Sequence, residues 1–420
     1  MQSSDTGLSL KSNMIWNSIG SLTYFGCQWL ITILVVRVSN SFEAAGTLSL
    51  AMSIANIFTP FALFRMRAYQ VSDISGEVTT AEYMGFRLFT SSLALVVCMA
   101  YSILTCAPAA IPCIFIYLLF KTVEQVIDVL AGLEQQKSRL DLAGKSLIIR
   151  GALTLFSFSA ALWLSNSIEL AVASMLLSSI LVLLGYDLRN ASQFDSLFPH
   201  WNGAKFSRLF IQCLPVVIAS IAAGAVMTFP KQHLEALYGT EILGIYSSIA
   251  APVALVQLGA SYIYSPLLGS FATSFSYGNI RSFFKTLGLT IIGITAIGIL
   301  AEGAALAFGA DAIDLLFGPA AAFHAYLLVP MIACSLFTGF YLFLSDLLLS
   351  IREFKGNCLS GVLSLAVALP LTFILVGSYG MNGVSFTGIA AYAVASVVAL
   401  LFLGIKMREN TVSQKETPNV

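Results

Sequence analysis

The sequence predicts an all-α integral membrane protein with twelve transmembrane helices. Three observations lead to this fold class: an apolar composition, repeated apolar runs of membrane-spanning length, and basic residues that favour every second connection. Of the 420 residues, 58% are hydrophobic and 10% are charged, against roughly 45–50% and about 25% in soluble domains. Continuous apolar runs such as 287–308 exclude a barrel of alternating strands.

The apolar runs between polar or turn-rich breaks give the expected spans, each near the roughly 20 residues that cross a hydrocarbon core. They lie at 14–36, 46–64, 86–107, 109–131, 146–165 and 168–186, and at 209–229, 244–268, 287–308, 326–349, 359–379 and 383–405. We therefore expect an N-terminal tail (1–13), an N lobe (14–186), an inter-lobe linker (187–208), a C lobe (209–405) and a C-terminal tail (406–420). The first span has no clear cleavage site and is interpreted as a retained helix.

The basic residues predict the orientation of the spans. Of the 21 Lys and Arg residues, 18 fall in the tails and connections on one side, namely Lys11, Arg65, Arg67, Arg87, Lys137, Arg139, Lys145, Arg150, Arg189, Lys205, Arg208, Arg281, Lys285, Arg352, Lys355, Lys406, Arg408 and Lys415. Arg37 and Lys231 fall on the other side, and Lys121 falls inside a span. Because basic residues accumulate in cytoplasmic connections, both termini are expected in the cytoplasm.

Several function classes find no support in the sequence. The net charge of zero gives no indication of a nucleic-acid partner. The seven cysteines and three histidines are dispersed without metal-ligand spacing, so we expect neither a metal nor another cofactor. No glycine-rich phosphate loop followed by Lys-Ser or Lys-Thr is present, which disfavours an ATP-driven pump. The short outer connections disfavour a membrane glycan polymerase or ligase, and we expect no enzyme.

An internal repeat is indicated at the first outer hairpin of each half. Glu43, Gly46 and Ser49 form an E-x-x-G-x-x-S pattern that returns 198 residues later (241 − 43) in the segment 241–247. Equivalent positions in the two halves favour two six-span repeats of the same orientation, as in many secondary transporters. A chance match between two helix starts is the alternative.

Ionisable residues within spans mark candidate functional sites, because each costs several kcal/mol unless it faces protein or water. Lys121, Glu124 and Asp128 follow an i, i+3, i+7 spacing and share one face of the fourth span. They line a water-filled cavity, or Lys121 and Glu124 form a local pair while Asp128 reaches the surface.

Four further cations lie at span ends. Arg37 and Lys231 lie at the outer ends of spans one and seven, from where both could address one vestibule. Arg65 and Arg67 lie at the inner end of span two. Anchoring of a helix end in the lipid headgroups is the alternative for all four.

The segments 33–37 (ILVVR) and 46–51 (GTLSLA) resemble the N-terminal signature of bacterial polysaccharide-biosynthesis transporters of the multidrug/oligosaccharidyl-lipid/polysaccharide (MOP) exporter superfamily. The segment 64–73 (FRMRAYQVSD), together with 229–231 (FPK) and 244–247 (GIYS), is similar to the Wzx-type flippases. Lipid II flippases of that superfamily have fourteen spans, and the expected twelve disfavour a peptidoglycan role.

This resemblance implies a MATE/MOP-like transporter in the bacterial cytoplasmic (inner) membrane, with two six-helix lobes around a central cavity. By alternating access it would move polyprenyl-diphosphate-linked oligosaccharide repeat units of O-antigen, capsule or exopolysaccharide to the outer leaflet. Its partners would be this lipid-linked oligosaccharide, membrane lipids, and the polymerase and chain-length machinery of the pathway. The diphosphate would meet Arg37, Lys121 and Lys231, with Arg65 and Arg67 at the cytoplasmic gate and Glu124 and Asp128 as candidates for H⁺ or Na⁺ coupling.

Two other transporter classes remain open on the residues alone. An ion-coupled drug or metabolite antiporter of the same fold would present carboxylates and aromatic rings to an organic cation. A major-facilitator porter is less consistent with the connection after span two, which lacks that family's Asp-Arg and Gly-Arg-rich pattern.

Overall fold

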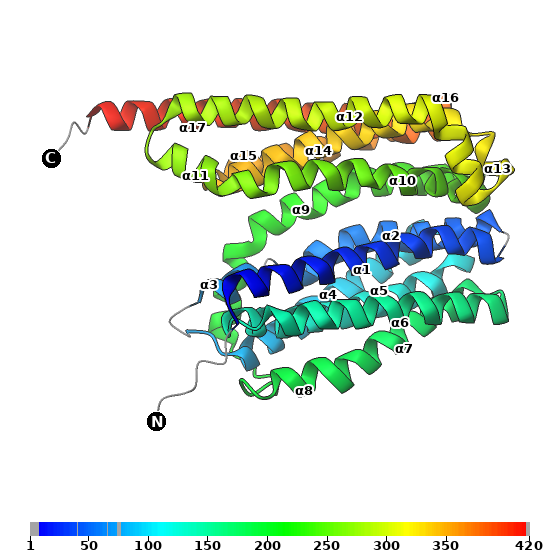
Figure 1. Ribbon diagram of the computed structural model, residues 1–420, viewed down its shortest axis with the longest axis horizontal. Coiled ribbons are helices and arrows are strands. Elements are labelled where there is room, and N and C mark those ends of the chain that lie inside the picture. The colour runs from blue at the N-terminus through cyan, green and yellow to red at the C-terminus, as the bar shows by residue number, and fades with distance from the viewer. Residues whose placement is uncertain (1–7, 40, 65, 74–76, 417–420) are drawn as a thin grey trace. The chain divides into compact units, whose positions relative to one another are not determined.

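The computed structural model describes residues 8–39, 41–64, 66–73 and 77–416, and all regular structure in these ranges is helical (Figure 1). Within them, 12 helical segments are long and apolar enough to cross a membrane. This confirms the predicted all-α, twelve-span fold class. The chain divides by its internal contacts into two units, residues 1–217 and 218–420.

The first unit contains six membrane-length segments and several short elements. They are α1 (Leu10–Ser39), α2 (Phe42–Leu63), α3 (Met66–Ser72), α4 (Thr80–Thr105), η1 (Pro108–Ala110), α5 (Ile111–Gln136), α6 (Leu140–Ser165), α7 (Ile168–Val182), η2 (Leu183–Asp187) and α8 (Leu188–Ala191). The η2 segment is a π-helical turn between α7 and α8. Such turns insert one extra residue per turn and rotate the side chains that follow.

The second unit begins inside α9 (Gly203–Tyr238), whose first turns belong to the first unit. It continues with α10 (Thr240–Tyr264), η3 (Ser265–Leu267), α11 (Leu268–Ser276), α12 (Ile280–Phe317), α13 (Pro319–Ala322), η4 (Ala325–Leu327), α14 (Leu328–Ser350), α15 (Phe354–Leu371), η5 (Thr372–Val376), α16 (Gly377–Tyr379) and α17 (Met381–Glu416). The contact boundary at 217/218 follows the expected linker of 187–208. The core of the second unit includes the aromatic side chains of Phe271, Phe283 and Phe343, all with 0% exposure.

The observed helices extend beyond several of the expected spans. The run expected at 146–165 begins at Leu140, and the run expected at 287–308 covers Ile280–Phe317. Hydropathy detects only the apolar part of a helix, whereas the backbone remains helical through its polar ends. The two E-x-x-G-x-x-S segments occupy equivalent places, since Glu43 lies in the first turn of α2 and Glu241 in the first turn of α10.

Glycines allow α1 and α6 to approach each other closely in the first unit. A Cβ added at Gly20 would meet the carbonyl oxygen of Gly144 and would lie 2.7 Å from its Cα. A Cβ added at Gly144 would in turn meet the carbonyl oxygen of Trp16. Small residues permit such backbone contact between membrane helices, where lipid supplies little hydrophobic drive for association. The neighbouring Gly26 has nothing within 4 Å of its added Cβ.

We expect Gly20→Ala to lower the thermal unfolding midpoint of the purified protein, because overpacking against a backbone costs about 1–3 kcal/mol. Gly26→Ala, in the same helix, is the matched control and should raise the midpoint slightly, since alanine stabilises a helix by about 0.5–1 kcal/mol over glycine. Equal midpoints for the two variants would contradict the close contact between α1 and α6.

Candidate functional site

The helix α5 presents the predicted set Lys121, Glu124 and Asp128, and all three side chains are half-buried. The local pair forms, with Lys121 Nζ 2.7 Å from Glu124 Oε2. The cavity also forms, because Glu124 and Asp128 line a space of about 230 Å³ together with residues of α1, α3, α6 and η2. The two interpretations of this face are therefore both realised in part.

Glu124 is held by more than its neighbour on α5. Arg150 of α6 places Nη2 3.8 Å from Glu124 Oε1. The hydroxyl of Tyr24, from α1, donates a hydrogen bond to the same oxygen, and its ring lies 4.7 Å from the Arg150 guanidinium carbon. One carboxylate thus has two cations and a phenol around it, which satisfies a charge that the membrane interior would otherwise disfavour.

Asp128 is held in the same way by two arginines. Arg67 Nη1, from α3, lies 3.0 Å from Oδ1, and Arg87 Nη2, from α4, lies 2.9 Å from Oδ2. Arg87 is fully buried and also donates from Nη1 to the carbonyl oxygen of Ala62 at 3.0 Å. Arg67 is the more accessible partner and donates to Gln135 Oε1 at 3.2 Å.

The positions of Arg87 and Arg150 correct the basic-residue count. Both were assigned to connections, yet both lie inside membrane-length helices and are buried, with 0% and 5% exposure. Their partners lie 41 and 26 (150 − 124) residues away in sequence. From the sequence alone, a basic residue near a helix end is interpreted as an anchor in the lipid headgroups. Which helix faces it is not known at that stage, so no local pattern identifies Arg87 and Arg150 as buried members of a polar network.

Two further carboxylates in this cavity were not predicted. Glu134 near the end of α5 and Asp187 at the end of η2 line the same space and are 1% and 2% exposed. Neither forms an ion pair with a residue that the structure describes. The sequence signal was weak, since each lies beside a polar stretch that resembles a connection.

The structure does not bring all the predicted cations to this cluster. Arg37 is exposed in the last turn of α1, 13 residues beyond Tyr24 (37 − 24), or about 20 Å along the helix. Lys231 is half-buried in the part of α9 that belongs to the second unit, and none of the described acidic groups pairs with it. Arg65 lies outside the described residues.

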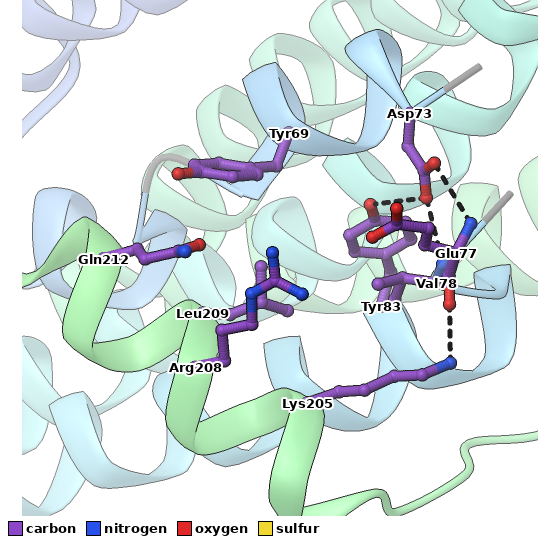
Figure 2. A pocket seen from close by; sticks show the side chains of 9 residues that line it. All are labelled: Tyr69, Asp73, Glu77, Val78, Tyr83, Lys205, Arg208, Leu209 and Gln212. Atoms are coloured by element: carbon purple, nitrogen blue, oxygen red, sulfur yellow. Dashed lines mark hydrogen bonds between the residues drawn. The ribbon is translucent and has the colours of Figure 1, made fainter. Parts of the chain in front are cut away.

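A second cavity, of about 270 Å³, lies in the first unit at the start of α9 (Figure 2). Lys205 closes one side and donates to the carbonyl of Glu77 at 2.6 Å and to Glu82 Oε2 at 2.8 Å. Opposite, Asp73 accepts from the backbone amides of Glu77 and Val78 at 3.1 and 3.0 Å. The cavity therefore has mixed charge, and much of its polar lining serves local structure.

The same contacts fasten the first turns of α9 to α4. Glu82 accepts from Asn202 Nδ2 at 3.0 Å as well as from Lys205, and its backbone N–H and carboxylate form a capping box with Thr79. The ring of Phe206 packs edge-on against Phe86 at 5.3 Å. These interactions explain why the contact boundary between the units lies within α9 and not before it.

No model of a known protein family matches the chain. The chain is 25% identical over 364 residues to the capsular polysaccharide biosynthesis protein CapF of Staphylococcus aureus, covering 86% of this chain and 91% of that protein. The similarity therefore extends over nearly the full length of both proteins.

Three solved structures share the fold. An inward-facing multidrug resistance MATE-family transporter of the MOP superfamily matches with a TM-score of 0.75 and 13% identity, over 97% of this chain and 100% of that chain. The lipid II flippase MurJ, in an inward closed conformation, matches with a TM-score of 0.73 and 13% identity, over 95% of this chain and 90% of that chain. A MOP superfamily transporter from Pyrococcus furiosus, described by a reversed polarity of its binding pocket, matches with a TM-score of 0.66 and 14% identity, over 94% of this chain and 95% of that chain. The chain therefore has the fold of these transporters.

We expect Asp128→Asn to destabilise the protein by about 3–5 kcal/mol, because it leaves the buried Arg87 without a counter-charge. Chemical unfolding of the purified protein measures the loss. The double variant Arg87→Met/Asp128→Leu removes both charges and should recover most of the stability, since Arg67 reaches solvent.

The exposed Asp195 provides the control, and Asp195→Asn should change the free energy of unfolding by less than about 0.5 kcal/mol. A double variant as unstable as Asp128→Asn would show that the cost comes from lost packing and not from an unpaired charge.

Proposed function

We propose that this protein is a flippase that moves polyprenyl-diphosphate-linked oligosaccharide repeat units from the cytoplasmic to the outer leaflet of a bacterial cytoplasmic membrane by alternating access. The observation that carries the proposal is the near full-length similarity to a capsular polysaccharide biosynthesis protein. The fold supports it, since it is shared with a lipid II flippase. Both termini would be cytoplasmic, and the repeat units would go on to capsule or a related surface polysaccharide and its polymerase and chain-length machinery.

An anionic cargo agrees with the cations inside the spans. A diphosphate that leaves water needs compensating charge, and guanidinium groups bind its oxygens in a bidentate manner. Lys231 is the clearest candidate, because it is half-buried and no described acidic residue pairs with it. Arg37 and Lys121 complete the proposed binding set, and Arg65 with Arg67 form the proposed cytoplasmic gate.

Two of these cations already form ion pairs with carboxylates. In the proposed cycle they would therefore exchange a carboxylate partner for the phosphate groups of the cargo. Lys121 pairs with Glu124 and Arg67 pairs with Asp128. A phosphate group would compete with these carboxylates for their cations. Glu124 and Asp128 would then be free to take up H⁺ or Na⁺, which is how they would couple an ion gradient to transport.

A drug or metabolite antiporter is the second candidate, favoured by the match to the multidrug MATE transporter. An organic cation gains nothing from Lys121 or Lys231. Lys121→Ala should therefore abolish polysaccharide export by a flippase, whereas an antiporter would retain drug efflux. Efflux assays and surface polysaccharide measured on the same strains separate the two functions.

We expect Lys231→Ala to reduce surface polysaccharide by about 10–100-fold in a complemented deletion strain, since a hydrogen bond to a charged group contributes about 1.5–3 kcal/mol. Lys231→Arg keeps the charge and should retain partial function. Lys285→Ala, which removes an exposed lysine of α12, should have no effect. The protein level in the membrane must be equal in all strains.

Deletion of the gene should trap lipid-linked repeat units in the cytoplasmic leaflet. Oxidation or lectin labelling of intact cells and of opened vesicles measures how the units are distributed between the leaflets. Normal delivery to the outer leaflet in the deletion strain would remove the flippase assignment.

A further inference from the structure

Several buried and half-buried carboxylates of the first unit are paired with cations, Glu82 with Lys205 alone. Three of them are each held by two cations, namely Glu124 by Lys121 and Arg150, Asp128 by Arg67 and Arg87, and Asp141 by Arg139 and Lys145. Each of these groups has a net charge of +1 when all members are ionised. Glu134 and Asp187 depart from the pattern, since no described cation pairs with either.

Glu134 and Asp187 both line the 230 Å³ cavity. Glu134 Oε1 and Asp187 Oδ2 are buried and have no hydrogen-bond partner among the described residues. The carboxylate of Asp187 interacts electrostatically with that of Glu134. The cavity is large enough for several water molecules, each of which takes about 30 Å³ in the liquid, so protons can reach the two groups through water.

Other buried polar atoms of the cavity are also unpartnered within the described chain. They are Gln125 Oε1 and the Nε and Nη1 atoms of Arg150, whose residues are both at least nine-tenths buried, while the Ser146 hydroxyl hydrogen-bonds to Asp187. Arg150 lines the cavity and has two buried N–H groups without a hydrogen-bond partner in the described chain. Unpaired N–H donors can bind an anion, and unpaired carboxylate oxygens can bind a proton. A cavity lined by residues with both kinds of group is therefore suited to binding an anion and a proton together.

The charged groups around the pair come from each neighbouring element. Arg67 faces Glu134 from α3, Arg139 from the turn after α5, and Asp141 from α6. Arg150 faces Asp187 from α6, and Tyr186 lies beside both on η2. Hydrogen bonds to Asp141 raise the pKa of Arg139, which keeps that guanidinium charged. These arginines repel a metal cation electrostatically, whereas a proton can bind to a single carboxylate oxygen.

We propose that Glu134 and Asp187 form a proton-binding pair, and that its protonation controls the affinity of this cavity for the phosphate groups of the cargo. The second half of this statement rests on the proposed function. Two like charges in a low-dielectric interior titrate as a coupled pair, and at least one is readily neutralised. Protonation leaves the surrounding cations uncompensated, so an anion then binds more tightly. By linkage, anion binding draws protons onto Glu134 and Asp187.

The proton pair is tested first without any cargo. Infrared difference spectra of the full-length protein in lipid nanodiscs, recorded across pH, report the carbonyl stretch of protonated carboxylic acids. We expect a titrating band in the wild type that is lost in Glu134→Gln/Asp187→Asn. Asp195→Asn, in an exposed carboxylate, should keep the band. A band unchanged in the double variant would overturn the proposal.

The linkage is tested with farnesyl diphosphate as the probe. Calorimetric titrations in two buffers of different ionisation enthalpy count the protons taken up on binding, and the difference between wild type and variant cancels the protonation of the probe. In the wild type we expect uptake, with binding about tenfold weaker per pH unit for each linked proton. The double variant should bind tightly at every pH without this uptake.

The outcomes separate the two proposals. Equal proton uptake by the wild type and the double variant would overturn the role of Glu134 and Asp187. Failure of farnesyl diphosphate to bind at any pH, with the infrared band intact, would remove the anionic cargo of the proposed function and support the proton pair alone. If the double variant does not fold, Glu134→Gln by itself should lower the uptake by about one proton.

Discussion

The ion pair between Arg87 and Asp128 is the interaction on which the polar interior of the first unit depends. A fully buried guanidinium in an apolar helix is costly unless its charge is paired. Asp128 supplies the charge, and the carbonyl oxygen of Ala62 accepts the second arm. This carbonyl lies in the last turn of α2, where the chain turns into a left-handed conformation at Phe64 and leaves helical acceptors unused. One arginine therefore ties the end of α2 to α4 and α5.

The same rule of charge compensation connects the structure to the proposed transport. Lys121 and Arg67, two of the cations proposed to bind a diphosphate in the first unit, are held by carboxylates in the absence of cargo, so their binding would be an exchange of partners. This arrangement compensates part of the cationic charge in the unit's interior before cargo arrives. Lys231 in the second unit differs, because no described acidic residue compensates it. The two units are thus alike in helix order and unlike in how their charges are satisfied.

Much of the fold was accessible from the sequence because the membrane imposes a simple rule. Every backbone group must be paired within its own helix, so an apolar run of sufficient length has one available structure. The pair Lys121–Glu124 was also accessible, since helical spacing alone brings these side chains together. The partners of Asp128 were not, because Arg67 and Arg87 reach it from α3 and α4 and were interpreted as cytoplasmic anchors. The π-helical turn that ends at Asp187 has no recognisable pattern in the sequence either.

The sequence by itself determined the class of protein, the twelve spans and the ionisable face of α5. These depend on composition and on periodicity within one helix, both of which are local properties. Only the tertiary structure decided which charges neutralise one another, that Arg87 and Arg150 are buried, and that Glu134 and Asp187 are left without cations. These depend on which helices face each other, and a membrane chain offers many apolar faces that are equivalent in sequence and distinct only after packing.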